Sequence, residues 1–201
     1  MITIFFAPPG AGKSTFCARF AWWNWFLSKF NLNSYERVLC NFPVKHTYLF
    51  EKDDIGVFDL SDGKKSSLIL MDEVSVEFHA RMYKSLQVHQ IEHFKKHRKY
   101  HEDFIIFSQV FDDMDKVLRD LAPRLYYIKK SLFFPFTVKA LRLRKSIMVD
   151  KDKHQVIDGY EFDPWYIRWI TTKRCYLPFY WGMFDSWDAP DLPKKNFTRY
   201  D

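Results

Sequence analysis

The sequence has few cysteines and no long apolar segment. Its three cysteines, Cys17, Cys40 and Cys175, are odd in number and share no metal-ligand spacing, which predicts reduced thiols in a cytosol rather than a disulfide framework. Polar and charged residues interrupt the aromatic stretches well before the roughly 20 apolar residues that a membrane-spanning helix needs. The first apolar run, residues 2–6, has no basic leader before it. We expect an intracellular protein with no transmembrane segment of its own, and we find no internal repeat.

The composition does provide material for a core. Hydrophobic residues make up 47% and aromatic residues 19% of the 201 residues, which is enough apolar surface to offset the entropy of ordering the chain. The length fits one α/β domain with a modest extension. Lys and Arg number 31 against 25 Asp and Glu, a net charge of +6. This excess is compatible with a polyanionic partner but does not by itself indicate one.

A phosphate-binding motif follows the first predicted strand. Residues 2–6 are apolar, a Pro-Pro-Gly turn ends the run, and helix-compatible sequence extends from about residue 13 to 30. Between them lies a Walker A pattern in which Ala7 replaces the usual first glycine. A chance turn between a strand and a helix is the alternative, but the strand and helix stand where the motif requires them. The predicted nucleotide-binding residues are Pro9, Gly10, Ala11, Gly12, Lys13, Ser14 and Thr15.

Each part of this motif has a role in binding MgATP. Gly10 and Gly12 let main-chain N–H groups surround the β-phosphate, and Lys13 neutralises oxygens of the β- and γ-phosphates. The hydroxyl of Ser14 can ligate Mg²⁺. Ala7 is compatible with the loop if its φ is negative.

A second motif places two acids at the end of an apolar strand. The continuous apolar run at residues 68–71 is typical of a strand buried on both faces of a parallel sheet. Asp72 would then lie near the Mg²⁺ shell, and Glu73 would polarise the attacking water. A surface turn is the alternative for such a pair. The Walker A motif earlier in the chain favours a Walker B motif.

Further catalytic groups are predicted around the next strand. P-loop enzymes with a catalytic Glu generally insert one strand between the Walker A and Walker B strands, and residues 104–107 are the candidate. Gln109 would lie at its carboxyl edge and sense the γ-phosphate, unless it merely closes a buried strand. Hydrolysis usually needs an arginine beside the γ-phosphate. Arg98, Arg119 and Arg124 are candidates, the first two acting in their own subunit or reaching a neighbour, although each is also explained by a structural role.

The pattern changes beyond residue 130. Residues 136–145 predict an antiparallel ribbon whose alternation slips in phase near Ala140, which indicates a β-bulge. Residues 160–187 are aromatic with scattered charges, and aromatic stretches of this kind favour core or subunit packing. We therefore expect a P-loop ATPase core at residues 1–130 and an extension at residues 131–201 that packs on it.

Histidines and basic residues form a third group. A predicted helix at about residues 82–99 carries part of a histidine ladder that is compatible with metal, but the surrounding positive charge favours a solvated or DNA-facing helix. The basic residues could contact phosphates of single-stranded DNA, with Tyr100 and Tyr126 stacking on bases, or form an ordinary solvated face. The ladder is His89, His93, His97 and His101, and the basic set is residues 93–101 with Lys129, Lys130, Lys139, Arg142, Arg144 and Lys145.

Together these motifs resemble the zonula occludens toxin (Zot) family, whose members are filamentous-phage assembly ATPases. The resemblance covers residues 1–130. It implies a P-loop fold related to the DNA-pumping FtsK/HerA translocases and an ATP-driven motor that extrudes virions or single-stranded DNA. It also implies oligomeric rings, a membrane-embedded assembly partner, and a place in the host cytoplasm at the inner membrane. The resemblance is carried by five segments: residues 7–15, Asn41-Phe42-Pro43, residues 68–73, His97-Arg98 before residues 103–109, and Asp115-Lys116 with Arg119.

Two other functions stay open at this point. A nucleotide or small-molecule kinase would share the P-loop, but it would not need Glu73 beside Asp72 and would usually carry an Arg-rich lid. A nucleotide-gated scaffold would keep Lys13 but could dispense with Glu73. The acidic pair therefore favours a MgATP-hydrolysing enzyme.

Overall fold

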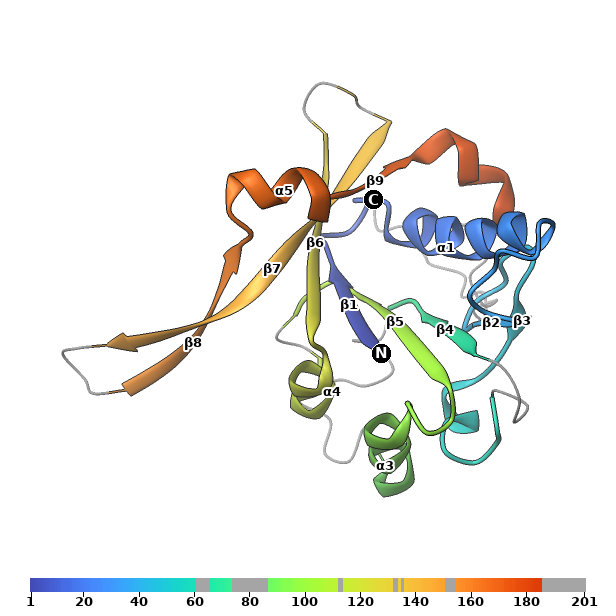
Figure 1. Cartoon of the computed structure of the whole chain (residues 1–201), viewed down its shortest axis with the longest axis horizontal. Helices are drawn as coiled ribbons and strands as arrows, with labels where there is room; N and C mark the ends of the chain where they lie inside the picture. Colours follow the sequence, from blue (N-terminus) through green and yellow to red (C-terminus); the bar gives the residue numbers. More distant parts are fainter. Residues whose placement is uncertain are drawn as a thin grey trace, which may run out of the picture.

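The computed structural model describes residues 1–60, 66–73, 87–111, 114–131, 134, 136–150 and 155–185. These residues form one mixed β-sheet with helices on its faces (Figure 1). In chain order the elements are β1 (Ile2–Phe6), α1 (Lys13–Ser28), β2 (Arg37–Cys40), β3 (Tyr48–Leu49), η1 (Lys52–Asp54), β4 (Ser67–Met71), α3 (Val88–Lys96), β5 (Glu102–Ser108), α4 (Lys116–Leu121), β6 (Arg124–Lys130), β7 (Thr137–Asp150), β8 (Gln155–Phe162), α5 (Trp165–Thr171), β9 (Lys173–Tyr176) and η2 (Leu177–Met183).

The strand order is β3-β2-β4-β5-β1-β6-β7-β8, and β9 pairs with β7. Strands β3, β2, β4, β5, β1 and β6 run parallel to one another, and apolar runs buried on both faces predict such strands. Strand β5 lies between β1 and β4, which confirms the additional strand between the Walker A and Walker B strands. The P-loop follows β1 and the acidic pair follows β4. Both therefore lie at the carboxyl edge of the parallel strands, with the end of β5 between them.

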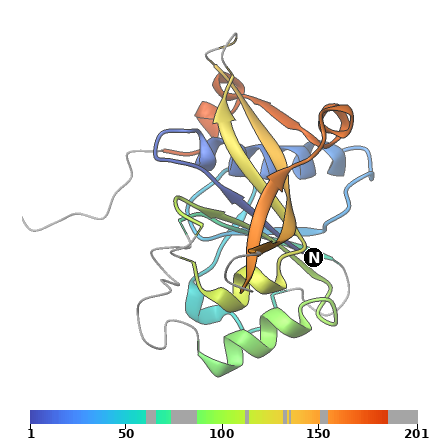
Figure 2. The same ribbon diagram turned by 90° about the vertical axis from the view of Figure 1, so that its left-hand side faces the viewer.

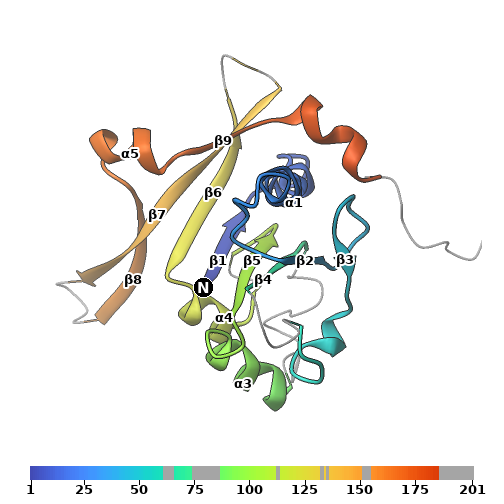
Figure 3. The ribbon, with the colours of Figure 1, turned by 45° about the vertical axis from the view of Figure 1, so that its right-hand side comes forward.

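Helices cover both faces of the parallel strands (Figure 3). On one face, α1 contributes Phe16 and Ala21 to a core that also contains Phe5 of β1. On the other face, α3 and α4 bury Phe94 and Leu118 against the same strands. Helix α3 begins at Val88, and the earlier part of the predicted helix lies outside the described residues. None of the helices in the described ranges has both the length and the apolar character needed to cross a bilayer.

Strand β7 continues the sheet in antiparallel fashion and forms a long hairpin with β8, beside α5 (Figure 2). Its pairing with β6 runs without interruption from Leu125↔Leu143 to Lys130↔Val138, so the expected β-bulge near Ala140 is wrong. The phase slip has another cause, because both faces of β7 are covered. Val138 and Ala140 pack in the core beneath α1, whereas Leu143 packs in the core on the α3 and α4 side.

Strand β9 and η2 bring the chain back onto α1. The ring of Trp22 packs edge-on against Phe179 and Tyr180, with ring centroids 4.9 and 6.0 Å apart. Trp22 therefore packs within its own chain. This return also brings the end of the described chain next to the loop between β1 and α1.

Candidate nucleotide-binding site

The loop between β1 and α1 has the backbone shape of a phosphate-binding loop. Gly10 and Gly12 have φ values of +69° and +88°, in the left-handed region that glycine adopts without steric cost. Ala7 is buried and is not among the residues with positive φ, so its methyl group fits where the motif usually has glycine. Its N–H donates to the carbonyl oxygen of Ser108 at 3.1 Å, which fixes the start of the loop to the end of β5.

Lys13 is the first residue of α1 and folds back over the loop. Its Nζ donates to the carbonyl oxygens of Ala7 at 3.0 Å and Pro8 at 3.4 Å. Burial lowers the pKa of Lys13, whereas the nearby Asp72 and Glu73 raise it. The hydrogen-bond partners of this ammonium group among the described residues are neutral carbonyl oxygens, so an anionic ligand would add the attraction of opposite charges. The loop therefore fits a polyphosphate.

Ser14 and Asp72 supply a pair of oxygen atoms beside the loop. The hydroxyl of Ser14 donates to Oδ2 of Asp72 at 2.5 Å. The side chain of Asn41, on the adjacent strand end, donates to the carbonyl oxygen of Asp72 and accepts from its N–H, both at 2.8 Å. Burial raises the pKa of Asp72, while the hydrogen bond from Ser14 opposes the shift. A hydroxyl and a carboxylate side by side are a suitable donor set for Mg²⁺, which prefers oxygen ligands.

Glu73 differs from Asp72 because it is exposed to solvent. Its φ of +53° places it in a left-handed conformation that is uncommon outside glycine, and such backbone conformations cluster at functional sites. Gln109 comes directly after β5, the strand next to β4, and its Nε2 donates to Oε1 of Glu73 at 2.8 Å. The site thus holds one buried carboxylate near Ser14 and one carboxylate open to water, an arrangement that suits metal binding by the first and proton transfer by the second.

A cavity of about 530 Å³ joins these groups to the C-terminal part of the chain. Glu73 and Gln109 line it together with the loop, and a second set of residues that sequence reasoning did not place there closes the other side. Phe136 and Trp181 meet edge-on, with ring centroids 6.1 Å apart. The only signal for this wall in the sequence is the aromatic content of the last segment. The additional lining residues are Lys130, Phe136, Leu177, Trp181 and Phe184.

The candidate arginines do not border this cavity in their own chain. Arg98 lines a different cavity with Ile2, at the edge of the sheet where β1 begins, whereas the P-loop follows the end of β1. Arg119 of α4 has its guanidinium over the ring of Phe111, 5.4 Å from the centroid. Arg124 starts β6 at the same edge as Ile2. Of the two alternatives for Arg98 and Arg119, action in their own subunit or in a neighbour, these positions favour the second.

Two members of the histidine ladder have structural partners. Nε2 of His93 lies 2.5 Å from Oε2 of Glu102, and Nδ1 of His97 lies 2.7 Å from the carbonyl oxygen of Phe94. Both rings are buried, so the expectation of a solvated ladder is wrong for them. The described part of the chain contains no group of three or more His, Cys, Asp or Glu side chains arranged to bind a metal. Tyr126 is also buried, stacked on Phe5, and does not present its ring to a ligand.

The sheet order and the loop define the class of protein, a P-loop NTPase with an additional strand between the Walker strands. The family model described as Zonular occludens toxin (Zot) matches residues 39–167, more than half of the chain, and the protein therefore belongs to this family. Among curated protein sequences none matches this chain.

Three solved structures are similar to this chain. The genome packaging NTPase B204 from Sulfolobus turreted icosahedral virus 2, in complex with ATP-gammaS, is 10% identical with a TM-score of 0.50, over 81% of this chain and 96% of that chain. The N-terminal domain of zonular occludens toxin from Neisseria meningitidis is 16% identical with a TM-score of 0.47, over 83% and 96% of the two chains. The flagellar accessory protein FlaH from Methanocaldococcus jannaschii is 12% identical with a TM-score of 0.49, over 81% and 89%. The likeness to B204, at 10% identity, concerns the fold alone.

Proposed function

We propose that this protein is a MgATP-hydrolysing motor of phage or mobile-element assembly, which drives extrusion or translocation of single-stranded DNA or virions. The observation that carries the enzymatic part is the pair of contacts at the ends of β4 and β5. Ser14 meets the buried carboxylate of Asp72, and Gln109 meets the exposed carboxylate of Glu73. A kinase or a scaffold has no need of the second pair.

The chain's own residues divide the work of hydrolysis. Main-chain N–H groups of the loop and the ammonium of Lys13 bind the phosphates. Ser14 and Asp72 would hold Mg²⁺, which supplies positive charge to the phosphate oxygens when it is bound. Glu73 takes a proton from the attacking water as the water oxygen bonds to the γ-phosphorus. The bond between the γ-phosphorus and the β–γ bridging oxygen breaks, which releases ADP. Gln109 holds the Glu73 carboxylate in position and reports whether a γ-phosphate is present.

The C-terminal wall of the cavity would receive the base and ribose. Phe136 and Trp181 line the cavity and are 51% and 53% exposed, so part of each side chain is open to a ligand. A nucleobase stacked against them would cover this surface. Lys130 on the same wall adds positive charge for the phosphates or ribose.

A ring of identical subunits would complete the site. Since neither Arg98 nor Arg119 borders the cavity of its own chain, the γ-phosphate needs an arginine from a neighbouring subunit. Arg119 is our choice, because Arg98 lines another cavity. We place the ring in the host cytoplasm at the inner membrane, where a membrane-embedded assembly partner would receive the cargo.

The decisive experiment is ATP turnover by the Glu73→Gln variant. Loss of the general base should lower Mg²⁺-dependent phosphate release by about 10²- to 10⁴-fold, while calorimetry with a non-hydrolysable ATP analogue should show unchanged binding. Glu92→Gln is the matched control, because Glu92 is exposed on α3 and pairs only with Lys96 among the described residues. An unchanged rate in Glu73→Gln would refute the role of Glu73.

Two further outcomes separate the other functions. Transfer of the γ-phosphate to an acceptor other than water would identify a kinase. Nucleotide binding with no turnover in the unmodified protein would identify a nucleotide-gated scaffold. Stimulation of turnover by single-stranded DNA would support the motor assignment.

A further inference from the structure

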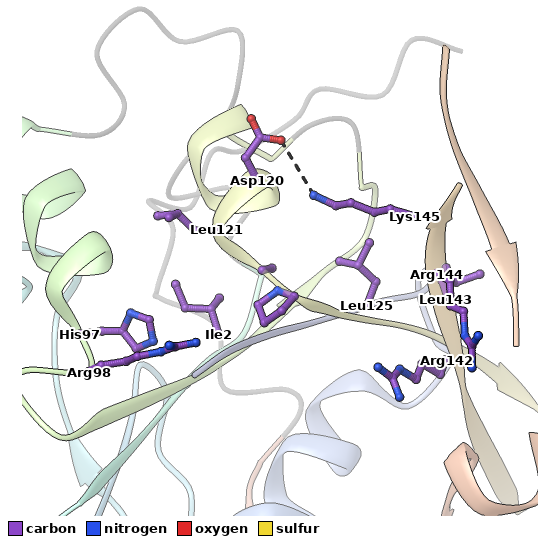
Figure 4. Close-up of a pocket in the computed structure, with 12 residues that line it drawn as sticks. Ile2, His97, Arg98, Asp120, Leu121, Leu125, Arg142, Leu143, Arg144 and Lys145 are labelled. Carbon is purple, nitrogen blue, oxygen red and sulfur yellow. Dashed lines mark ion pairs between the residues drawn. The ribbon is translucent and has the colours of Figure 1, made fainter. Parts of the chain in front are cut away.

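A second cavity, of about 460 Å³, opens at the edge of the sheet opposite the P-loop (Figure 4). Its floor includes Ile2 at the start of β1 and Leu125 near the start of β6. Arg98 and His97 enter from the end of α3, and β7 supplies the opposite wall (Figure 4). Four cationic side chains line this cavity against a single lining acid, Asp120; they are Arg98, Arg142, Arg144 and Lys145.

Only part of this positive charge is neutralised within the chain. Arg144 pairs with the buried carboxylate of Asp163, and Nζ of Lys145 lies 4.0 Å from Oδ1 of Asp120. Arg98 and Arg142 have no carboxylate partner in the described part of the chain. Nε of Arg142 is buried and has no hydrogen-bond partner among the described residues. A buried charged donor without a partner is destabilising, so an acceptor in the cavity would stabilise Arg142.

His97 adds a second polar atom of this kind. Its side chain is 7% exposed and lines the cavity, and its Nε2 has no hydrogen-bond partner among the described residues. Because Nδ1 is held by the carbonyl oxygen of Phe94, Nε2 accepts in the neutral ring and donates in the protonated ring. A phosphate oxygen only accepts, so His97 can bond to it only through the protonated ring.

The guanidinium groups specify the chemistry of that ligand. Arginine presents parallel N–H donors that match two oxygens of one phosphate or carboxylate, and phosphate is the commoner partner where several arginines converge. Arg98 and Arg142 approach the cavity from opposite sides (Figure 4). Phosphate oxygens of one strand would be acceptors for each of these groups.

The neighbouring strand indicates a polymer with bases. On β8, Tyr160 pairs with Lys145 and Phe162 pairs with Leu143, so both rings lie beside residues that line the cavity. They are 38% and 45% exposed; Tyr160 packs edge-on against Phe111, and the guanidinium of Arg168 lies over the ring of Phe162, so the bases would stack on the ring surface that stays open. Cationic grooves flanked by partly exposed aromatic rings are typical of single-strand binding, in which bases stack on the rings and the cations hold the backbone.

We propose that this cavity binds the phosphodiester backbone of single-stranded nucleic acid, at a site separate from the nucleotide site. The inference rests on the proposed function only for the identity of the cargo. Arg98, Arg144 and Lys145 are exposed and Arg142 is half-buried, so a flexible strand can reach the outer cations while one phosphate enters toward Arg142. The rigid backbone of a duplex cannot bend into a cavity of this size, which lies within the range of small-ligand pockets.

The test is fluorescence anisotropy of a labelled oligothymidylate with the full chain, without ATP. We expect Arg98→Gln and Arg142→Gln each to weaken binding by about tenfold. The slope of log K against log[salt] should also fall by about 0.7 for each phosphate that the variant no longer binds. Arg174→Gln is the control, because it removes the same charge from an exposed arginine that stacks on Trp169 and lines neither cavity. Equal losses in all three variants, or no loss in the first two, would overturn the proposal.

Further arms identify the ligand and guard against misfolding. A duplex of the same length should bind more weakly, and inorganic phosphate at an equal concentration of phosphate groups should not displace the oligonucleotide. Displacement by inorganic phosphate would instead identify a site for a free anion, and Arg142-dependent self-association without DNA would identify a contact between copies. Arg142→Lys keeps the charge but not the paired donors, so it should bind with intermediate affinity and a salt slope near that of the unmodified protein.

The same preparations separate this inference from the proposed function. Arg142→Gln should keep its ATP turnover in the absence of DNA, because Arg142 lies at the other edge of the sheet from the P-loop. Turnover without Arg142-dependent DNA binding would refute the second site alone. DNA binding that depends on Arg142, in a protein that does not hydrolyse ATP, would refute the motor function alone.

Discussion

Nε2 of Gln109 donates a hydrogen bond to Oε1 of Glu73 at 2.8 Å, which joins the carboxyl ends of β5 and β4. The two residues are 36 positions apart in the sequence and meet because their strands are neighbours. In a hydrolase this contact would hold the general base until a γ-phosphate competes for the amide of Gln109. The contact therefore offers a direct link between nucleotide state and the position of Glu73.

Removing this amide should slow hydrolysis without preventing nucleotide binding. For Gln109→Ala we expect ATP turnover to fall on the order of 10²-fold, as for loss of one positioned donor in other active sites. Gln109→Asn keeps the amide but shortens its reach, so it should show a similar loss. Steady-state phosphate release against ATP concentration is the measurement. A normal rate in Gln109→Ala would mean that the hydrogen bond has no catalytic role.

Trp181 should contribute to nucleotide affinity through its ring. Stacking on a base contributes about 1–3 kcal/mol, so Trp181→Ala should raise the Kd for ATP by about 5- to 150-fold, whereas Trp181→Phe should retain most of the affinity. Calorimetric titration checks this. Trp165→Ala is the control, because Trp165 is 76% exposed on α5 and lies outside the nucleotide cavity. An equal Kd for Trp181→Ala and the control would contradict the stacking role.

Asp72 should reduce stability at neutral pH. Burial raises its pKa in the folded chain above the ordinary value of 3.8, so the folded state holds the proton more tightly than the unfolded chain. The stabilisation from this proton is complete below pH 3.8 and is lost as the pH rises through the higher folded pKa.

The variant Asp72→Asn should therefore melt at a higher temperature than the unmodified protein at pH 7, by about 2–4 °C for each kcal/mol relieved. The asparagine oxygen can keep the bond from the Glu73 N–H, and its amide can donate to Ser14. The gain should shrink as the pH falls toward 4, while Mg²⁺-dependent turnover is lost at every pH. Thermal melts in magnesium-free buffer measure the first effect, and a gain independent of pH would contradict its electrostatic origin.

Gly12 should tolerate a side chain less well than Gly10. Both residues have left-handed φ values, so alanine at either position costs about 1–2 kcal/mol. A Cβ on Gly12 would also lie 2.9 Å from Cδ2 of Leu177, whereas a Cβ on Gly10 would meet no atom within 4 Å. We expect Gly12→Ala to lower the free energy of unfolding by roughly 1 kcal/mol more than Gly10→Ala. Chemical denaturation without nucleotide gives this difference, and equal losses would show that Leu177 moves aside freely.

The parts of the fold that the sequence predicted are those with local chemical causes. The loop needed two glycines with positive φ, and Gly10 and Gly12 stand at those positions. The apolar run that forms β4 predicted a strand buried on both faces, and the acidic pair at its end predicted the position of β5 between β1 and β4. The strand order confirms this prediction. The roles of Lys13, Asp72, Glu73 and the other site residues stay predictions that the experiments above test.

Other features depended on which faces of the chain are covered. The alternation around Ala140 indicated a bulge, but burial on both faces of β7 explains the pattern without one. Tyr126 lies in a basic segment, yet its ring is stacked on Phe5 in the core. His93 and His97 share a helical stripe, but Glu102 and the carbonyl oxygen of Phe94 each bind one ring nitrogen, Nε2 of His93 and Nδ1 of His97.

The sequence by itself determined the phosphate-binding loop, the acidic pair and the alternation of strands and helices, because these depend on residues close together in the chain. Only the tertiary structure decided that Trp181 and Phe136 close the nucleotide cavity, and that Arg98 and Arg142 face a cavity at the other edge of the sheet. The reason is physical. Local sequence fixes the backbone conformation of each element, whereas long-range strand pairing, such as that of β9 with β7, decides which distant side chains share a surface.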